Sequence, residues 1–169
     1  MSLRGHHKAT TGTVQTASFL VVRFGRNICA LPAQCVRGVL TCEEVGAGRS
    51  VTAVGVTYQA LDVAGRFSAS VDLTHPNART VLYSNGQSHG AIRAEEVIGM
   101  VDAEREQCLP LPPHFREAER TWISGMLFFR DQLVLILNPE WVLGEIGEVA
   151  MVGGAAKALS SSMVLSKTC

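Results

Sequence analysis

Two segments of the chain, 61 positions apart, have the same order of apolar runs and turn residues. Residues 19–40, FLVVRFGRNICALPAQCVRGVL, align without a gap to residues 80–101. The five identical pairs are Gly25 and Gly86, Ala30 and Ala91, Ala33 and Ala94, Val36 and Val97, and Gly38 and Gly99. Ordinary residue usage gives about one or two identities in a window of this length. The alignment therefore predicts an internal duplication, and we expect the fold of this chain to contain the same unit twice.

Each copy begins with a predicted β-hairpin. In the first copy, apolar and β-branched residues 19–24 lead into Gly25-Arg26-Asn27 and then into residues 28–31. In the second, residues 80–84 and 88–92 flank Asn85-Gly86, a dipeptide that tolerates the positive φ angles of a tight hairpin turn. After the first hairpin, the positions of Val36, Val39 and Leu40 predict one face of a short helix.

The remaining pattern also predicts short strands. Residues 50–56 and 57–63 are strand-like around Gly55, and residues 122–129 and 132–137 flank Arg130-Asp131 as a further hairpin. Asn138 precedes a proline and a glutamate, so we expect it to cap a short helix. Asp62 follows a strand in the same way, and capping is the preferred interpretation for it over a role as a general acid or base.

Composition excludes several classes of function. Apolar residues make up 47% of the 169 residues, which is typical of a folded chain. Acidic and basic side chains number 15 each, so no net field attracts nucleic acid or an anionic membrane. Residues 1–18 lack the apolar stretch of a signal peptide, and no later stretch has the apolar length of a membrane span. We expect a cytoplasmic protein without membrane insertion.

Many short strands, a two-fold repeat and helices at the junctions predict a mostly β fold of two small barrels. The predicted organisation is a disordered N-terminus (residues 1–16), a folded region (residues 17–145) with barrel subdomains of approximately residues 17–75 and 76–145, and a flexible or weakly helical tail (residues 146–169). Apolar residues in this tail, such as Met151 and Val152, could dock on a partner.

The order of these motifs resembles the CheW-like adaptors of bacterial chemotaxis. The motifs are Leu31-Pro32, Val36-Arg37-Gly38-Val39, Leu61-Asp62-Val63, Gly90-Ala91-Ile92 with residues 97–101, and Ile123-Ser124-Gly125 leading through residues 131–134 to Leu137-Asn138-Pro139. The resemblance implies a pair of five-stranded SH3-like barrels and an adaptor with no catalytic site and no cofactor. It also implies two partners, a chemotaxis-type histidine kinase and a receptor cytoplasmic domain.

The chain departs from the family pattern at two places. Family members usually carry an acidic residue at the position of Gly38, and a segment such as Asn-Leu-Arg-Gly in the third strand region. Here residues 45–59 contain no such segment, and Arg49 is the single cation among them. Polar groups of this kind confer specificity for a partner, so the departures leave open a divergent paralogue that binds another regulator or forms a homodimer.

The candidate protein-interface residues come from the repeat and from this resemblance. They are Val36, Arg37, Gly38, Arg49, Val21, Arg23, Phe128 and Arg130. Arg37 lies beside the family's acidic position and is expected to point off the apolar face of its helix. Strand residues Val21, Arg23, Phe128 and Arg130 are expected to face away from the barrel interiors, where an edge or groove could receive a partner helix or strand.

An enzyme based on a thiol or a metal is the third hypothesis. Cys29, Cys35 and Cys42 lie within fourteen residues, but their spacing is not that of a common structural zinc site. Cys29 lies between apolar neighbours in a predicted strand, so a small buried hydrophobic residue is the preferred interpretation. No cation cluster flanks Cys35 or Cys42 to lower a thiol pKa. The sequence therefore predicts no metal site and no catalytic residue.

Overall fold

The computed structural model describes residues 15–45 and 48–144, which form ten strands with short helices between them. The first five strands are β1 (Thr16–Phe24), β2 (Asn27–Pro32), β3 (Val36–Thr41), β4 (Ser50–Ala53) and β5 (Val56–Leu61). The second five are β6 (Arg79–Ser84), β7 (His89–Ala94), β8 (Glu96–Glu104), β9 (Ile123–Phe129) and β10 (Gln132–Leu137). The helices are η1 (Ala33–Cys35), α1 (Cys42–Val45), α2 (Val63–Arg66), η2 (Arg105–Gln107), α3 (Glu117–Trp122) and one over residues 139–144.

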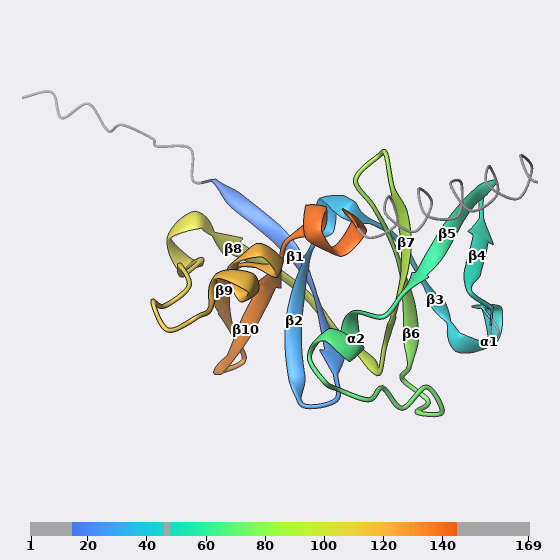
Figure 1. Cartoon of the computed structure of the whole chain (residues 1–169), viewed down its shortest axis with the longest axis horizontal. Helices are drawn as coiled ribbons and strands as arrows, with labels where there is room; N and C mark the ends of the chain where they lie inside the picture. The colour runs from blue at the N-terminus through green and yellow to red at the C-terminus, as the bar shows by residue number, and fades with distance from the viewer. Residues whose placement is uncertain (1–14, 46–47, 145–169) are drawn as a thin grey trace, which may run out of the picture.

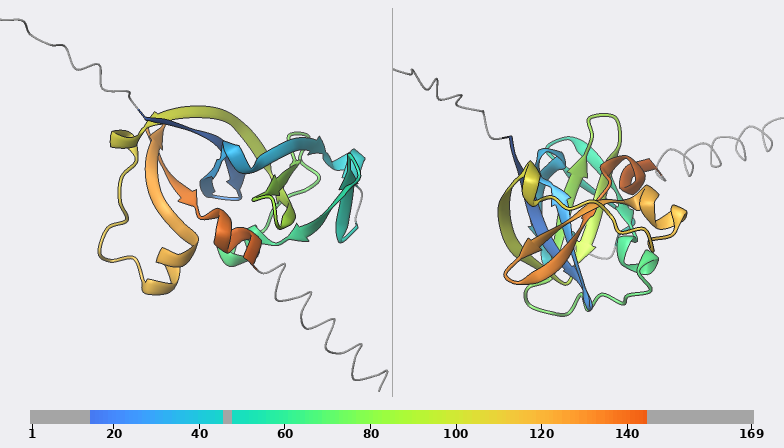
Figure 2. Two further views of the ribbon diagram at one scale, coloured as in Figure 1. Left: turned by 90° about the horizontal axis from the view of Figure 1, so that it is seen from above. Right: turned by 90° about the vertical axis from the view of Figure 1, so that its left-hand side faces the viewer.

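The strands form two five-stranded sheets that lie side by side (Figure 1). Sheet A has the order β8-β1-β2-β10-β9, and sheet B has the order β3-β6-β7-β5-β4. Both sheets curve strongly, so that each has an inner and an outer face (Figure 2). The prediction of a mostly β fold with two five-stranded units and short junction helices is confirmed.

The two sheets have the same topology once the duplication is taken into account. Replacing β1–β5 by β6–β10, and the reverse, converts the strand order of sheet B into that of sheet A. Each sheet therefore combines the first hairpin of one repeat with the last three strands of the other. The boundary predicted near residues 75 and 76 separates the two repeats, whereas each sheet takes strands from both sides of it.

The residue register repeats as well. Gly38 on β3 pairs with Leu82 on β6, and Gly99 on β8 pairs with Val21 on β1. Gly38 and Gly99 are 61 positions apart, and so are Val21 and Leu82, so the two pairs are equivalent. The parallel pairs agree in the same way, because β5 lies beside β7 as β10 lies beside β2. Such agreement in pairing confirms the duplication that five identities had predicted.

Three apolar cores among the described residues hold this arrangement together. One fills the inner face of sheet A and one the inner face of sheet B. The largest lies between the sheets, where the outer faces of the hairpins β1–β2 and β6–β7 meet, with Val22 and Tyr83 at equivalent positions. Residues of α2 and of the helix over residues 139–144 close this central core. Apolar residues here stabilise the fold by about 1.5–3 kcal/mol each.

The predicted helix at residues 36–40 is wrong, because this segment is the edge strand β3. Val36, Gly38 and Leu40 are half-buried, whereas Arg37, Val39 and Thr41 are exposed. This alternation has the period of a strand. Three apolar residues at spacings of three and four did not distinguish the two periods, and pairing with β6 decided the outcome.

The predicted caps are confirmed. Asp62 precedes α2, and its Oδ1 accepts a hydrogen bond from the Gly65 N–H at 2.8 Å. Asn138 precedes the helix over residues 139–144, and its Oδ1 accepts from the Glu140 N–H at 3.1 Å. The predicted tail (residues 146–169) and residues 1–14 of the predicted disordered N-terminus lie outside the described residues. The last residue of that predicted N-terminus, Thr16, is described and is the first residue of β1.

Candidate interaction surfaces

Arg37 lies at a bulge on the free edge of sheet B. The register of β3 against β6 shifts between Val36 and Gly38, so Arg37 has no partner residue across the strand pair. Its side chain is exposed. Because a bulge redirects the side chain of the extra residue, this position presents a cation to solvent beside an edge strand. Arg37 therefore remains a candidate contact residue, but it lies on a strand and not on the predicted helix.

Gly38 is not required by the backbone of β3. A Cβ atom added there would lie 3.6 Å from the Leu82 Cδ1, which is an ordinary van der Waals distance. Arg49, which precedes β4, is exposed, and its carbonyl accepts a hydrogen bond from the Ala60 N–H at 2.8 Å. The backbone of β3 thus does not require a glycine at residue 38, and a Cβ atom there would lie beside the buried Leu82.

The expectation that Val21 and Arg23 face a partner is wrong for Val21. Val21 is fully buried in the core of sheet A. The apolar run in β1 is covered on one face by that core and on the other by the central core, so this part of the strand has no outward side. Arg23 is partly buried, and its Nε lies 3.1 Å from the Glu96 Oε2 of the neighbouring strand.

The outer face of the hairpin β9–β10 exposes large apolar side chains. Phe128 is 63% exposed and Leu133 is 48% exposed, and the two residues lie directly opposite each other. Met126 continues the same face but is buried, and its backbone pairs with Leu109 through two hydrogen bonds of 2.7 and 2.9 Å. Arg130 is exposed in the turn that follows β9. Phe128 and Arg130 thus lie on the surface as expected.

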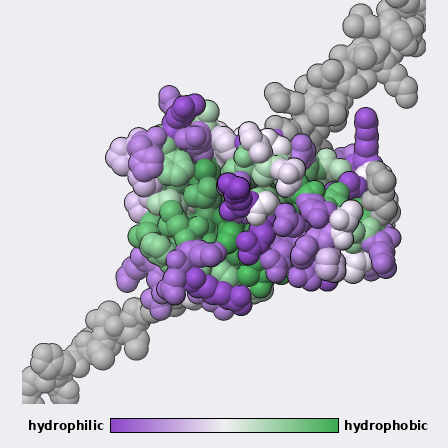
Figure 3. All heavy atoms as spheres, turned by 90° about the horizontal axis from the view of Figure 1, so that it is seen from below, coloured by the Kyte–Doolittle hydropathy of each residue, from purple (hydrophilic) through white to green (hydrophobic). Residues whose placement is uncertain are grey.

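The equivalent hairpin of the other repeat, β4–β5, has a polar outer face. In place of Phe128 and Leu133 it has Thr52 and Thr57, whose hydroxyl oxygens lie 3.3 Å apart. Apolar side chains gather over the half of the molecule that holds sheet A, and mainly polar ones over the half that holds sheet B (Figure 3). Because the backbones are equivalent, the apolar face of β9–β10 is not a requirement of the fold.

Sequence reasoning named Phe128 but missed Leu133 and the apolar face that the two residues form together. The run QLVLIL in β10 is apolar on both sides, so alternation within the strand could not identify the side that faces solvent. The available signal was the alignment of Asp62 with Asn138, which places Thr52 opposite Phe128 and Thr57 opposite Leu133. In this hairpin, the two positions that are polar in one copy and apolar in the other are both exposed.

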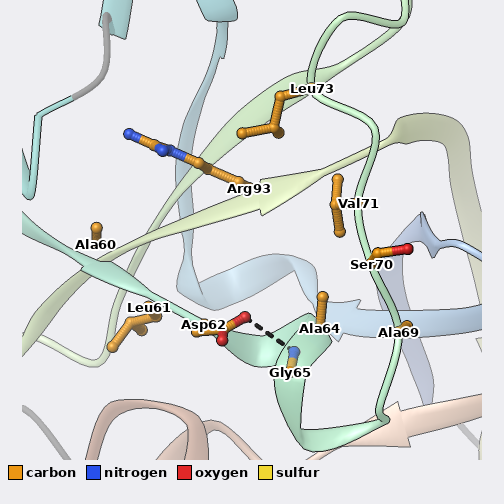
Figure 4. Close-up of a pocket in the computed structure, with 10 residues that line it drawn as sticks. All are labelled: Ala60, Leu61, Asp62, Ala64, Gly65, Ala69, Ser70, Val71, Leu73 and Arg93. Atoms are coloured by element: carbon orange, nitrogen blue, oxygen red, sulfur yellow. Dashed lines mark hydrogen bonds between the residues drawn. The ribbon is translucent and has the colours of Figure 1, made fainter.

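A hollow of about 390 Å³ lies beside α2 (Figure 4). Its walls come from the end of β5, from α2, from residues 69–73 and from Arg93 on β7. Asp62 serves here as the helix cap, and Arg93 donates a hydrogen bond to the Gly48 carbonyl at 2.8 Å. Small apolar residues such as Ala60 and Ala64 make up much of the remaining wall. The two charged side chains in the wall of the hollow, Asp62 and Arg93, therefore both make hydrogen bonds within the fold.

The buried thiols lie in the apolar core, as is usual for structural cysteines. Cys29 is fully buried, as predicted, and burial raises the pKa of its thiol to about 12. Cys35 is also buried, whereas Cys42 and Cys108 are partly exposed. Cys169 lies outside the described residues. Among the described residues, no group of three or more His, Cys, Asp or Glu side chains could hold a metal ion.

Comparison with known proteins gives the family. A model of the CheW-like domain matches residues 18–146, which span both repeats. The chain belongs to the CheW-like domain family. Membership in this family makes the protein a scaffold or adaptor of the chemotaxis type, a class that is not enzymatic.

The fold agrees with this CheW-like assignment. A crystal structure of the scaffolding protein TtCheW from Thermoanaerobacter tengcongensis is similar, with a TM-score of 0.63 and 13% sequence identity over 73% of this chain and 90% of that chain. No curated protein matches the sequence. Within the described residues, no helix has the length and apolar character needed to cross a membrane.

Proposed function

We propose that the protein is a cytoplasmic adaptor that links the cytoplasmic tips of chemotaxis-type receptors to a histidine kinase. The observation that carries this proposal is the CheW-like domain match over both repeats. An adaptor that holds two partners together needs two surfaces that do not overlap. The edge of sheet B around Arg37 and the outer face of β9–β10 in sheet A are separate surfaces of this kind.

The two surfaces differ in what they contribute to binding. Exposed aromatic and aliphatic side chains such as Phe128 and Leu133 gain free energy when a partner covers them, so the β9–β10 face supports most of the affinity. The exposed cation at Arg37 contributes orientation and association rate, because charges at the rim of an interface act mainly on those properties. Arg49 belongs with Arg37 as an exposed cation of sheet B.

The test is affinity purification at low salt with the histidine kinase and a receptor cytoplasmic fragment of the same organism as baits. The proposal expects both baits to retain the protein. Arg37→Glu should weaken retention of at least one bait about tenfold, because it reverses the exposed charge. Arg26→Glu is the matched control, since Arg26 is also exposed but lies in the β1–β2 turn. Failure of both baits to retain the wild-type protein would contradict the proposal and leave the fold unaffected.

The glycine at residue 38 favours a second candidate, a CheW-like paralogue that has lost these partners and binds another regulator or itself. Gly38→Glu distinguishes the two functions, because a Cβ atom at residue 38 has ordinary van der Waals contact with Leu82 and no clash with the backbone. A tight homodimer in light scattering, together with kinase binding that appears when the acid is introduced, would support the paralogue. Kinase binding by the wild-type chain would reject it.

A further inference from the structure

Two polar side chains face the interior of sheet B. Thr80 on β6 and His89 on β7 each precede a member of the inner core by two residues, so they lie on the same face as that core. Thr80 is 1% exposed, and its Oγ1 atom has no hydrogen-bond partner in the described part of the chain. The Nδ1 atom of His89 is also buried, and it lacks a partner within residues 15–45 and 48–144. Either tautomer of the imidazole leaves this nitrogen unsatisfied, so both groups destabilise the closed sheet.

The equivalent positions of sheet A are apolar. Phe19 lies 61 positions before Thr80, and Ile28 lies 61 positions before His89. Both residues pack in the inner core of sheet A. That core has seven buried members among the described residues, whereas the inner core of sheet B has four. Closing sheet B therefore removes less apolar surface from water and leaves polar groups unpaired, so we expect its closed state to be the less stable of the two.

The hairpin β4–β5 is joined to the rest of sheet B mainly through side chains. β5 pairs with β7 over residues 59–61, and β4 is an edge strand of four residues that pairs with β5. Residues 50–58 supply Val51 and Tyr58 as buried members of the inner core. The ring centroid of Tyr58 lies 5.5 Å from that of His89, so this tyrosine covers the unpaired imidazole.

The end of β5 is the fixed end of this hairpin. Leu61 packs against the central core, and a Cβ atom added at Gly90 would overlap its side chain. The hairpin of the other copy has a further attachment, because the backbone of Leu109 bonds to that of Met126 on β9 at 2.7 and 2.9 Å. No bridge of this kind reaches β4 in the described residues. The hairpin β4–β5 is thus fixed at one end and held elsewhere by a few side chains.

We propose that residues 50–58 open as a unit away from sheet B, turning about the end of β5, while the hairpins β1–β2 and β6–β7 stay folded. Opening admits water to Thr80 and His89, which then make the hydrogen bonds that the closed sheet does not provide. It also brings the inner-core residues Leu82 and Ala91 to the surface. Sheet B therefore has a second, open state that its copy lacks. This opening is a property of the free chain, so it does not rest on the proposed kinase and receptor contacts.

The experiment is hydrogen–deuterium exchange of the full chain without a partner, at urea concentrations below the unfolding transition. A hairpin that leaves its sheet loses protection, because two strands alone are only marginally stable in water. The proposal expects amides of β4–β5 to exchange at least about tenfold faster than those of β9–β10. Their exchange should depend weakly on urea, because opening exposes little of the surface that global unfolding exposes. Equal rates in the two hairpins, or the urea dependence of global unfolding, would overturn the proposal.

Two variants test the cause of the opening. His89→Ile introduces the residue of the copy, and Thr80→Val removes the hydroxyl group with little change of shape. Each should slow exchange in β4–β5 at least about fivefold and leave β9–β10 unchanged, because the closed sheet no longer buries that unpaired polar group. Gln87→Ile is the matched control, since Gln87 is exposed in the β6–β7 turn, and it should change neither hairpin. Unchanged exchange of β4–β5 in Thr80→Val would overturn the proposal. Equal slowing in both hairpins would also overturn it, because the polar groups would then act on global stability.

Discussion

The hairpins β4–β5 and β9–β10 are copies of one another that have kept the same backbone and acquired opposite outer faces. Their inner faces are both apolar, with Val51 in one and Leu127 in the other. On the outside, Thr52 and Thr57 stand where Phe128 and Leu133 stand in the second copy. The fold constrains the inner face because the core has to be filled. The outer face is free of that constraint, so its chemistry can differ between the two copies.

The inner faces should show the largest effects. Leu127→Ala should lower the free energy of unfolding by about 2–5 kcal/mol, because a fully buried leucine leaves a cavity. Val51→Ala in the other hairpin should lower it by about half as much, since fewer carbon atoms are lost and Val51 lies in a smaller core. Urea unfolding measures both. A larger loss for Val51 would mean that sheet B, and not sheet A, has the tighter interior.

The outer faces should separate binding from stability. Phe128→Thr with Leu133→Thr gives β9–β10 the outer residues of its copy, and should reduce affinity for the kinase or the receptor fragment at least about tenfold. The free energy of unfolding should change by less than about 1 kcal/mol, because both side chains are largely exposed. Calorimetry measures the affinity. Unchanged binding to both partners would show that the apolar face is not a docking surface for them.

The control for that swap is Thr52→Ser with Thr57→Ser, which keeps the polar character of β4–β5. It should leave binding to both partners unchanged. If it weakened binding as much as the Phe128 and Leu133 variant, then the two outer faces would serve the partner equally and the contrast between the copies would lose its functional meaning.

The turns of the two hairpins should differ more modestly. Val54 has φ 51° in the β4–β5 turn, a strained angle for a β-branched residue, and its side chain is fully exposed. Val54→Asn should raise the free energy of unfolding by about 1 kcal/mol, because asparagine before Gly55 suits a tight hairpin turn. Arg130→Asn should gain less. Arg130 has φ 48° but is not β-branched, and its guanidinium lies 5.0 Å from the centre of the Phe129 ring.

Thermal unfolding followed by circular dichroism measures the two turn variants. If Val54→Asn and Arg130→Asn raised the free energy of unfolding equally, the contact between Arg130 and the Phe129 ring would not stabilise the fold. Branching at Cβ would then not determine the backbone strain at Val54.

The polar pair should have the smallest effect. Thr52→Ala with Thr57→Ala removes the hydroxyl contact across β4–β5 and should lower the free energy of unfolding by about 0.2–1 kcal/mol, the usual contribution of a cross-strand pair. Chemical denaturation measures this loss. A loss as large as that of Leu127→Ala would show that the outer face of β4–β5 is not a free surface.

Much of the fold followed from local chemistry. Gly25 and Gly86 both have positive φ angles in hairpin turns, and their alignment revealed the duplication. Asp62 and Asn138 cap helices because a carboxylate or amide oxygen after a strand can accept from the next free N–H groups. Cys29 is buried because its neighbours in β2 are. These features depend on a few neighbouring residues, and the sequence contains all of them.

The errors occurred where one strand meets two environments. Val21 was expected on the surface because a strand of a small barrel usually has one wet face, but β1 is covered on both. The segment around Val36 was expected to be helical because its three apolar residues fit either period, and β6 supplied the missing partner. The helix α3 was not predicted, and neither was the contact between its Trp122 and the ring of Trp141, at 5.3 Å.

The amino-acid sequence was enough to indicate that one unit occurs twice, that each unit begins with a hairpin, and which positions carry turns and caps. The tertiary structure decided how the units combine, since each hairpin completes the sheet of the other repeat. It also decided that Val21 is buried and that Leu133 is exposed. The physical reason is that turns and caps depend on hydrogen bonds within a few residues, whereas the two sides of an apolar strand become different only when another layer of the protein covers one of them.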